Sequence, residues 1–152
     1  MEALSIRTGS FAELGQAAYA VRKKVFVEEQ GIPEDVVFDG FDEGALQFVL
    51  FSGQNPAAAA RCLQMKEGLW RIGWVAVLRE KRGLHLGERL MRAAIEAAAL
   101  QGATEIELDA QLYASGFYQK LGFEACSAAF PEGDFQLLPM RLSLAALPAS
   151  EI

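Results

Sequence analysis

Leu69-Trp70-Arg71-Ile72-Gly73-Trp74-Val75-Ala76-Val77-Leu78 is a nearly continuous apolar run. A run of this kind predicts a strand at the centre of a sheet, covered on both faces. A loop rich in charge and glycine follows it, Arg79-Glu80-Lys81-Arg82-Gly83-Leu84-His85-Leu86-Gly87. The next segment, Glu88 to Gln101, has its apolar residues at helical spacing. The three segments predict a buried strand, a loop and a helix in direct succession.

The loop before this helix is a candidate anion site. The first turn of a helix presents unpaired N–H groups, and the helix dipole adds partial positive charge there. Gly83 and Gly87 let the backbone approach a pyrophosphate closely, and Lys81, Arg89 and Arg92 add longer-range attraction. Neither a Walker loop nor the G-x-G-x-x-G fingerprint is present. A glycine-containing turn that binds nothing is the alternative interpretation.

Towards the N-terminus the sequence predicts a strand, a helix and a hairpin. Ser10 and Glu13 form a capping-box pattern before a helical apolar spacing, and Gly31 and Pro33 end that helix. Strands are predicted at residues 4–7, 45–51 and 57–65, with turns at 52–56 and 66–68.

Towards the C-terminus the sequence predicts a strand at 104–108, a second helix at 110–121 and strands at 123–127 and 135–142. No internal repeat, low-complexity tract or linker interrupts the chain. We therefore expect one domain over residues 1–152, of the α/β (α+β) class, with a mixed sheet.

Composition narrows the classes of function. The chain has 152 residues, 52% hydrophobic and 22% charged, so a globular fold is expected. No apolar run reaches the roughly 18 residues of a membrane span, and the start lacks a signal-peptide pattern, so we expect a cytoplasmic protein with no membrane partner. The net charge of −6 disfavours nucleic acid. Two cysteines without a CxxC pair and one histidine predict no metal site.

The charges are unevenly distributed. No Lys or Arg occurs from Val25 to Ala60, and the acids in that segment are Glu28, Glu29, Glu34, Asp35, Asp39, Asp42 and Glu43. This acidic segment, next to the basic loop, fits a region that attracts cations beside one that binds anions. Two solvated faces are the alternative.

The second predicted helix carries two adjacent aromatic residues, Phe117 and Tyr118. Phe117 and Leu121 are four residues apart and face the core, whereas Tyr118 is offset by about 100° around the helix. Tyr118 can therefore present its hydroxyl to a cleft. A core tyrosine with a satisfied hydroxyl is the alternative, and Tyr113 competes for the same role.

Two motifs together resemble the GNAT acyltransferase superfamily. Its pattern (Q/R)-x-x-G-x-(G/A), after a central strand and opening a helix, is similar to Arg82-Gly83-Leu84-His85-Leu86-Gly87. Its later helix often carries a pattern similar to Phe117-Tyr118-Gln119-Lys120-Leu121-Gly122-Phe123. The segment from Val21 to Gln30, with Asp39 and Asp42, resembles the ElaA-like branch. The resemblance implies a mostly antiparallel central sheet with helices on both faces.

The resemblance also implies a reaction. Acetyl-CoA would donate an acetyl group to a primary amine of a small molecule or peptide, by direct attack in a ternary complex, without a metal. Tyr118 would protonate the leaving thiolate, and a backbone N–H near Val75–Val77 would stabilise the oxyanion. The residues implied to bind acetyl-CoA are Val75, Ala76, Val77, Arg82, Gly83, Leu84, His85, Leu86, Gly87 and Glu88.

Several points stay open at this level. Glu28 and Glu29 are candidate bases in the segment that lines the acceptor side of such folds, and a solvated helix end is the alternative. His85 replaces the middle glycine of the motif, and at Asp109 the related branch commonly has histidine. These departures motivate the alternatives of a non-catalytic acyl-CoA sensor or an interaction domain. A homodimer, the acyl chain length and the amine are likewise left open.

Overall fold

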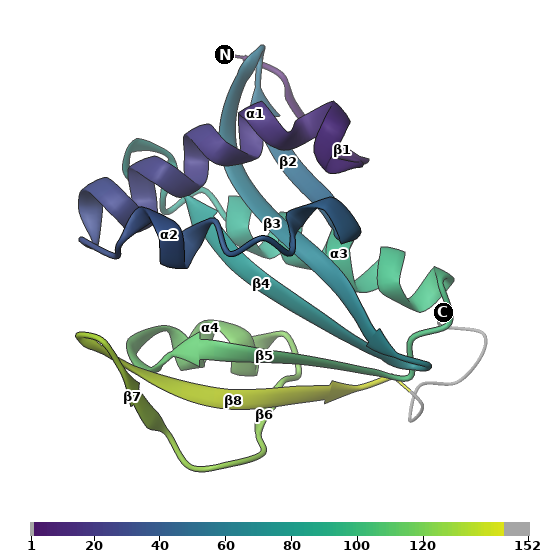
Figure 1. The fold of residues 1–152 in the computed structure, drawn as a ribbon. Coiled ribbons are helices and arrows are strands. Elements are labelled where there is room, and N and C mark those ends of the chain that lie inside the picture. Colours follow the sequence, from purple (N-terminus) through teal and green to yellow (C-terminus); the bar gives the residue numbers. More distant parts are fainter. Residues whose placement is uncertain (1, 145–152) are drawn as a thin grey trace.

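The structure is a computed structural model that describes residues 2–144 of the chain. Within them the strands form one sheet in the order β1-β2-β3-β4-β5-β8-β6, and β7 pairs with β8 (Figure 1). The strands are β1 (Leu4–Gly9), β2 (Leu46–Ser52), β3 (Asn55–Lys66), β4 (Leu69–Val77), β5 (Glu105–Gln111), β6 (Glu124–Ala125), β7 (Phe130–Glu132) and β8 (Phe135–Ser143).

The helical segments are α1 (Phe11–Arg22), the π-helix η1 (Lys23–Glu29), α2 (Glu34–Val37), α3 (Leu86–Leu100), α4 (Ser115–Lys120) and three short 3₁₀ turns, η2 (Asp42–Gly44), η3 (Arg79–Lys81) and η4 (Leu112–Ala114). The predicted capping box before α1 is confirmed, because the Glu13 amide donates to Ser10 Oγ at 3.2 Å and the Ser10 amide donates to Glu13 Oε1 at 3.0 Å.

Helices cover both faces of the sheet, as the sequence predicts (Figure 1). On one face α1 packs against β2 and β3 around Ala18, Val21 and Val49. On the other face α3 buries Leu86, Leu90 and Ala94 in the larger core. The apolar stripe of α3 makes this packing possible, since residues three and four apart share one side of a helix. No helix among residues 2–144 is long and apolar enough to cross a membrane.

The strands β4 and β5 form a parallel pair inside a sheet whose other pairs are antiparallel. They pair only where Leu69–Arg71 faces Glu105–Glu107, and beyond Arg71 they separate (Figure 1). The separation opens the sheet at the carboxyl ends of two neighbouring strands. Ligands of open sheets commonly bind at such a position.

The central strand β4 carries a β-bulge. Opposite it, Ala59 pairs with Ala76 and Arg61 pairs with Gly73, so Trp74 and Val75 lie across from one residue of β3. Trp74 adopts φ +51°, a left-handed conformation that is rare for a bulky residue. A bulge leaves a residue without a ladder partner and bends its strand. Here it follows closely after Arg71, the last residue of β4 that pairs with β5.

The predicted helix at 110–121 was wrong in its first half. Ala110 and Gln111 complete β5, where they pair with Leu138 and Leu137 of β8, and a 3₁₀ turn precedes α4. Helix propensity is a weak preference that tertiary contacts override. Here Ala110 and Gln111 pair with β8 instead of forming a helix. The predicted strand at 123–127 shrinks to Glu124–Ala125, and β7 and α2 were not predicted.

Candidate active site

A cleft of about 950 Å³ lies where β4 and β5 separate. Most of the residues that the sequence implicates line it, namely Val75, Ala76, Val77, Arg82, Gly83, His85, Leu86, Gly87, Glu88 and Tyr118. Leu84 does not line the cleft and is 58% exposed. The structure therefore brings the basic loop and the aromatic helix, which are far apart in the sequence, to one cavity.

The loop before α3 has the shape of an anion cradle. Gly83 has φ +83° with open space around its Cα, and His85 has φ +61° immediately before the first turn of α3. A Cβ on Gly87 would lie 3.3 Å from Cζ of Phe117, so glycine allows α3 to pack closely against α4. Leu86, Gly87 and Glu88 form the first turn of α3 and line the cleft, so an anion there would meet the positive end of the helix dipole.

His85 replaces the middle glycine of the expected motif. Its backbone is left-handed, which is strained for a residue with a side chain. The imidazole is 84% exposed, and its Nδ1 lies 3.7 Å from Glu88 Oε2. Although His85 lines the cleft, its imidazole is not packed into it. Gly83 has open space where a side chain would stand, so the residues present fit a diphosphate.

Tyr118 lies on α4 with its ring among aromatic neighbours. Its ring centroid is 5.0 Å from that of Phe117 and 6.1 Å from that of Phe123, both in edge-on contacts. Burial raises the pKa of Tyr118 above its ordinary value. Tyr118 lines the cleft, and among the described residues no hydrogen bond engages its hydroxyl. The raised pKa keeps the phenol protonated at neutral pH, so it can act as a hydrogen-bond donor.

The candidate bases Glu28 and Glu29 lie elsewhere. They line a smaller depression with Lys24, Leu78 and Arg79 and are not part of the cleft that holds Tyr118. The carboxylate of Glu29 instead accepts hydrogen bonds from both terminal nitrogens of Arg82, at 2.7 and 2.8 Å. The hydrogen bonds from Arg82 lower the pKa of the Glu29 carboxyl, which makes it a weaker proton acceptor.

Comparison with known proteins identifies the family. A family model of the acetyltransferase (GNAT) domain matches residues 15–144. The chain belongs to the GNAT acetyltransferase family. It is 34% identical over 110 residues to the uncharacterized N-acetyltransferase YjcF of Bacillus subtilis, covering 72% of this chain and 78% of that protein.

Two solved structures share this GNAT fold. ElaA of Escherichia coli has a TM-score of 0.85 at 25% identity, over 93% of this chain and 100% of that one. An acyl-CoA N-acyltransferase from Pseudomonas aeruginosa has a TM-score of 0.84 at 29% identity, with the same coverage of 93% and 100%. The predicted resemblance, including its ElaA-like character, is therefore confirmed.

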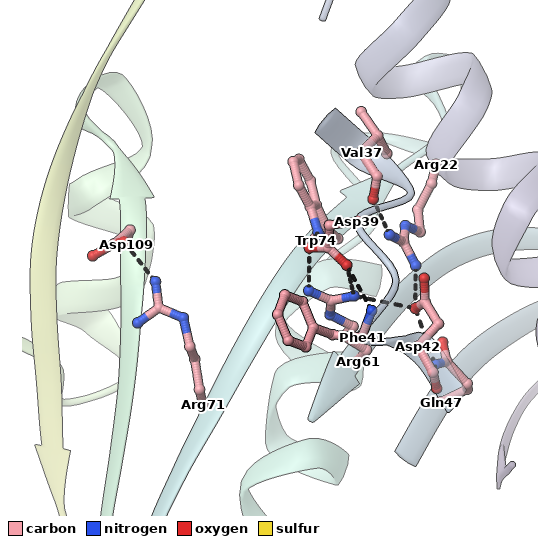
Figure 2. A network of polar contacts seen from close by, with 10 residues as sticks. All are labelled: Arg22, Val37, Asp39, Phe41, Asp42, Gln47, Arg61, Arg71, Trp74 and Asp109. Carbon is pink, nitrogen blue, oxygen red and sulfur yellow. Dashed lines mark hydrogen bonds and ion pairs between the residues drawn. The ribbon is translucent and has the colours of Figure 1, made fainter. Parts of the chain in front are cut away.

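On the α1 face of the GNAT sheet, a buried polar network was missed by sequence reasoning (Figure 2). Arg22 is 1% exposed; its Nη1 bonds Asp42 Oδ1 at 2.6 Å, and its Nη2 donates to the carbonyl of Val37. Gln47 Nε2 donates to the same Asp42 oxygen at 3.3 Å. The network fixes the segment after η1 against the sheet, and so shapes the wall of the cleft.

Arg61 extends this network to the cleft. Its two terminal nitrogens bond both oxygens of Asp39, at 2.7 and 2.6 Å, and Trp74 Nε1 donates to Asp39 Oδ2 at 3.3 Å. Although burial opposes its ionisation, the bonds from Arg61 and from the Phe41 amide lower the pKa of Asp39 to about 2. The sequence hinted at this network only through an acidic segment that contains no cation. The arginines that pair with its acids lie on distant, largely apolar elements.

The opposite wall of the cleft carries a second cluster. Arg71 on β4 bonds Asp109 Oδ2 of β5 at 2.5 Å (Figure 2). It also bonds Glu107 Oε2 of β5, at 2.8 Å. Arg71 sits at the last paired position, so it joins the two strands where they begin to separate. Nearby, Gln111 Nε2 donates to Gln30 Oε1 at 2.8 Å, which links the end of β5 to the segment after η1. Among residues 2–144 no group of metal-binding side chains occurs.

Proposed function

We propose that this protein transfers an acetyl group from acetyl-CoA to a primary amine of a small molecule or peptide, by direct attack in a ternary complex. The observation that carries the proposal is the shared cleft. It joins a helix-start cradle at residues 82–87 to a protonated tyrosine, Tyr118, across the separation of β4 and β5. A diphosphate at one end and a sulfur near the phenol at the other would span that cleft.

The cradle would hold the donor through its backbone. The left-handed residues Gly83 and His85 turn the chain before α3, and the following N–H groups are the acceptor-free donors of a helix start. Lys81 and Arg82 line the same cleft. Lys81 adds positive charge, whereas the charge of Arg82 is balanced by Glu29. An anion in this position gains both hydrogen bonds and the favourable helix dipole.

The bulge in β4 supports the oxyanion role proposed for Val75–Val77. Trp74 and Val75 share one partner on β3, so the backbone here departs from regular pairing beside the cleft. An N–H that is free of the ladder can donate to a carbonyl oxygen that becomes negative during attack. A donor fixed in the strand needs no reorganisation in the transition state.

Tyr118 would complete the transfer. When the amine nitrogen bonds to the acyl carbon, the carbon–sulfur bond breaks and the thiolate takes a proton from the phenol. The raised pKa of Tyr118 keeps that proton available at neutral pH. Glu28 and Glu29 stay candidate acceptors of the amine proton through water, and a cytoplasmic location, a single domain over residues 1–152 and a homodimer stay predictions.

The test incubates the protein with acetyl-CoA and three amines, butylamine, putrescine and glucosamine, and follows release of free thiol. We expect thermal stabilisation by acetyl-CoA and thiol release that depends on an amine. Stabilisation without release on any amine would instead support an acyl-CoA sensor. If acetyl-CoA does not stabilise the protein, the proposed donor site and the proposed function are both wrong.

A further inference from the structure

The cleft is lined by four carboxylate side chains among the described residues, and they differ in what they already bind. Both oxygens of Asp39 are bonded by Arg61, and Glu88 is paired with Arg92 at 2.8 Å. Glu132 is exposed on the edge strand β7. The fourth, Asp109, is partly shielded, with its side chain 26% exposed.

Asp109 keeps one oxygen without a partner. Arg71 bonds Oδ2 at 2.5 Å, and no hydrogen bond to Oδ1 occurs among residues 2–144. Arg71 also bonds Glu107, so one guanidinium faces two carboxylates and the cluster keeps a net charge of about −1 at neutral pH. The bond from Arg71 fixes the orientation of the carboxylate, which leaves Oδ1 as a rigid, anionic acceptor at the cleft.

The position of Asp109 fits the acceptor side of the cleft. Glu107, Asp109 and Gln111 alternate on one face of β5, opposite to Ile106, Leu108 and Ala110, which are buried in the core. That face also carries Arg71, and the Gln30–Gln111 hydrogen bond closes it at the far end of β5. The cleft therefore offers a charged group between two closed ends, which suits a small cation.

We propose that Oδ1 of Asp109 binds the acceptor amine as its ammonium ion and orients the nitrogen for attack; this rests on the proposed acetyl transfer. The ammonium loses one proton to solvent before the nitrogen bonds to the acyl carbon. As the carbon–sulfur bond breaks, the sulfur takes the proton of Tyr118, and the second proton of the nitrogen restores the phenol, so atoms and charges balance. Asp109 touches the substrate and its carboxylate selects amines over neutral alcohols.

The experiment compares Asp109→Asn with a matched control, Glu107→Gln. Both residues lie on β5, bond the same guanidinium and lose one negative charge, but Glu107 does not line the cleft. With butylamine as the probe, we expect KM for the amine to rise about 10- to 100-fold in Asp109→Asn, which is the loss of one charge-assisted hydrogen bond. For Glu107→Gln we expect a change below about fivefold, and Asp109→Glu should recover part of the loss.

The stabilisation by acetyl-CoA serves as a check on folding and on the donor site, and it should be equal in all variants. Equal effects of Asp109→Asn and Glu107→Gln on KM would show that Asp109 acts only through Arg71, which would overturn this proposal and leave the proposed function intact. A wild-type protein that acetylates none of the three amines would overturn the proposed function and the role of Asp109 together.

Discussion

The guanidinium of Arg82 forms a two-bond ion pair with the carboxylate of Glu29, with Nη1–Oε2 and Nη2–Oε1 distances of 2.7 and 2.8 Å. The pair joins the loop before α3 to the π-helix η1, which follows α1 on the other face of the sheet. Arg82 Nε also donates to the carbonyl of Val77 at 3.0 Å. The pair therefore fixes the entry of the proposed donor site.

We expect Glu29→Gln to alter acetyl-CoA binding more than the chemical step. The substitution leaves Arg82 without its anionic partner, so the loop loses a restraint, and Kd for acetyl-CoA should change. A general base at this position would instead cost roughly 10²- to 10⁴-fold in kcat. Steady-state kinetics on butylamine decide between the two, and Glu28→Gln is the adjacent control. A collapse of kcat in Glu29→Gln, but not in Glu28→Gln, would identify Glu29 as the general base.

Breaking the buried pair between Arg22 and Asp42 should be costly. In Asp42→Asn the Arg22 guanidinium loses its charge partner at a site that is 1% exposed, and we expect the free energy of unfolding to fall by about 3–5 kcal/mol. Glu105→Gln, which removes an exposed partner of Arg141, should cost less than about 1 kcal/mol. Urea denaturation measures both, and similar losses would contradict the importance of burial.

Asp39 predicts one part of the acid sensitivity. Its folded pKa of about 2 lies below its ordinary value of 3.8, so the stability that it contributes is present above pH 3.8 and is lost as the pH falls from 3.8 towards 2. We expect Asp39→Asn to be less stable than the wild type at neutral pH and to lose less stability over that interval. Chemical denaturation at several pH values tests this, and parallel curves would exclude Asp39 as the group concerned.

Strain at His85 predicts a gain in stability. His85→Gly removes a side chain from a left-handed backbone and relieves its strain. Glycine also raises the entropy of the unfolded chain, which offsets part of this relief, so we expect the free energy of unfolding to rise by less than about 1.5 kcal/mol. The neighbouring Leu84 has no positive φ, so Leu84→Gly should bring no gain. Thermal unfolding with and without acetyl-CoA measures the effect. A destabilised His85→Gly would mean that the imidazole makes a favourable contact in the loop.

The sequence predicted the parts of this molecule that local patterns determine. The apolar run of β4, the glycine loop and the amphipathic α3 each carry their own periodicity, and the capping box at Ser10 is a local hydrogen-bond motif. The buried network could not be predicted, because Arg22 and Asp42 or Arg61 and Asp39 meet only after the sheet has formed. The helix prediction at Ala110 was wrong for the same reason, since its strand conformation depends on pairing with β8.

Tyr118 is proposed to protonate the leaving thiolate in the cleft that also holds the donor. Single-turnover acetyl transfer to butylamine by Tyr118→Phe, compared with Tyr113→Phe, measures this role, because Tyr113 is 76% exposed and precedes the same helix. We predict that Tyr118→Phe slows the step roughly 10²- to 10⁴-fold with an unchanged Kd for acetyl-CoA, and that Tyr113→Phe stays near the wild-type rate. A wild-type rate of transfer by Tyr118→Phe would show that the phenol does not protonate the thiolate.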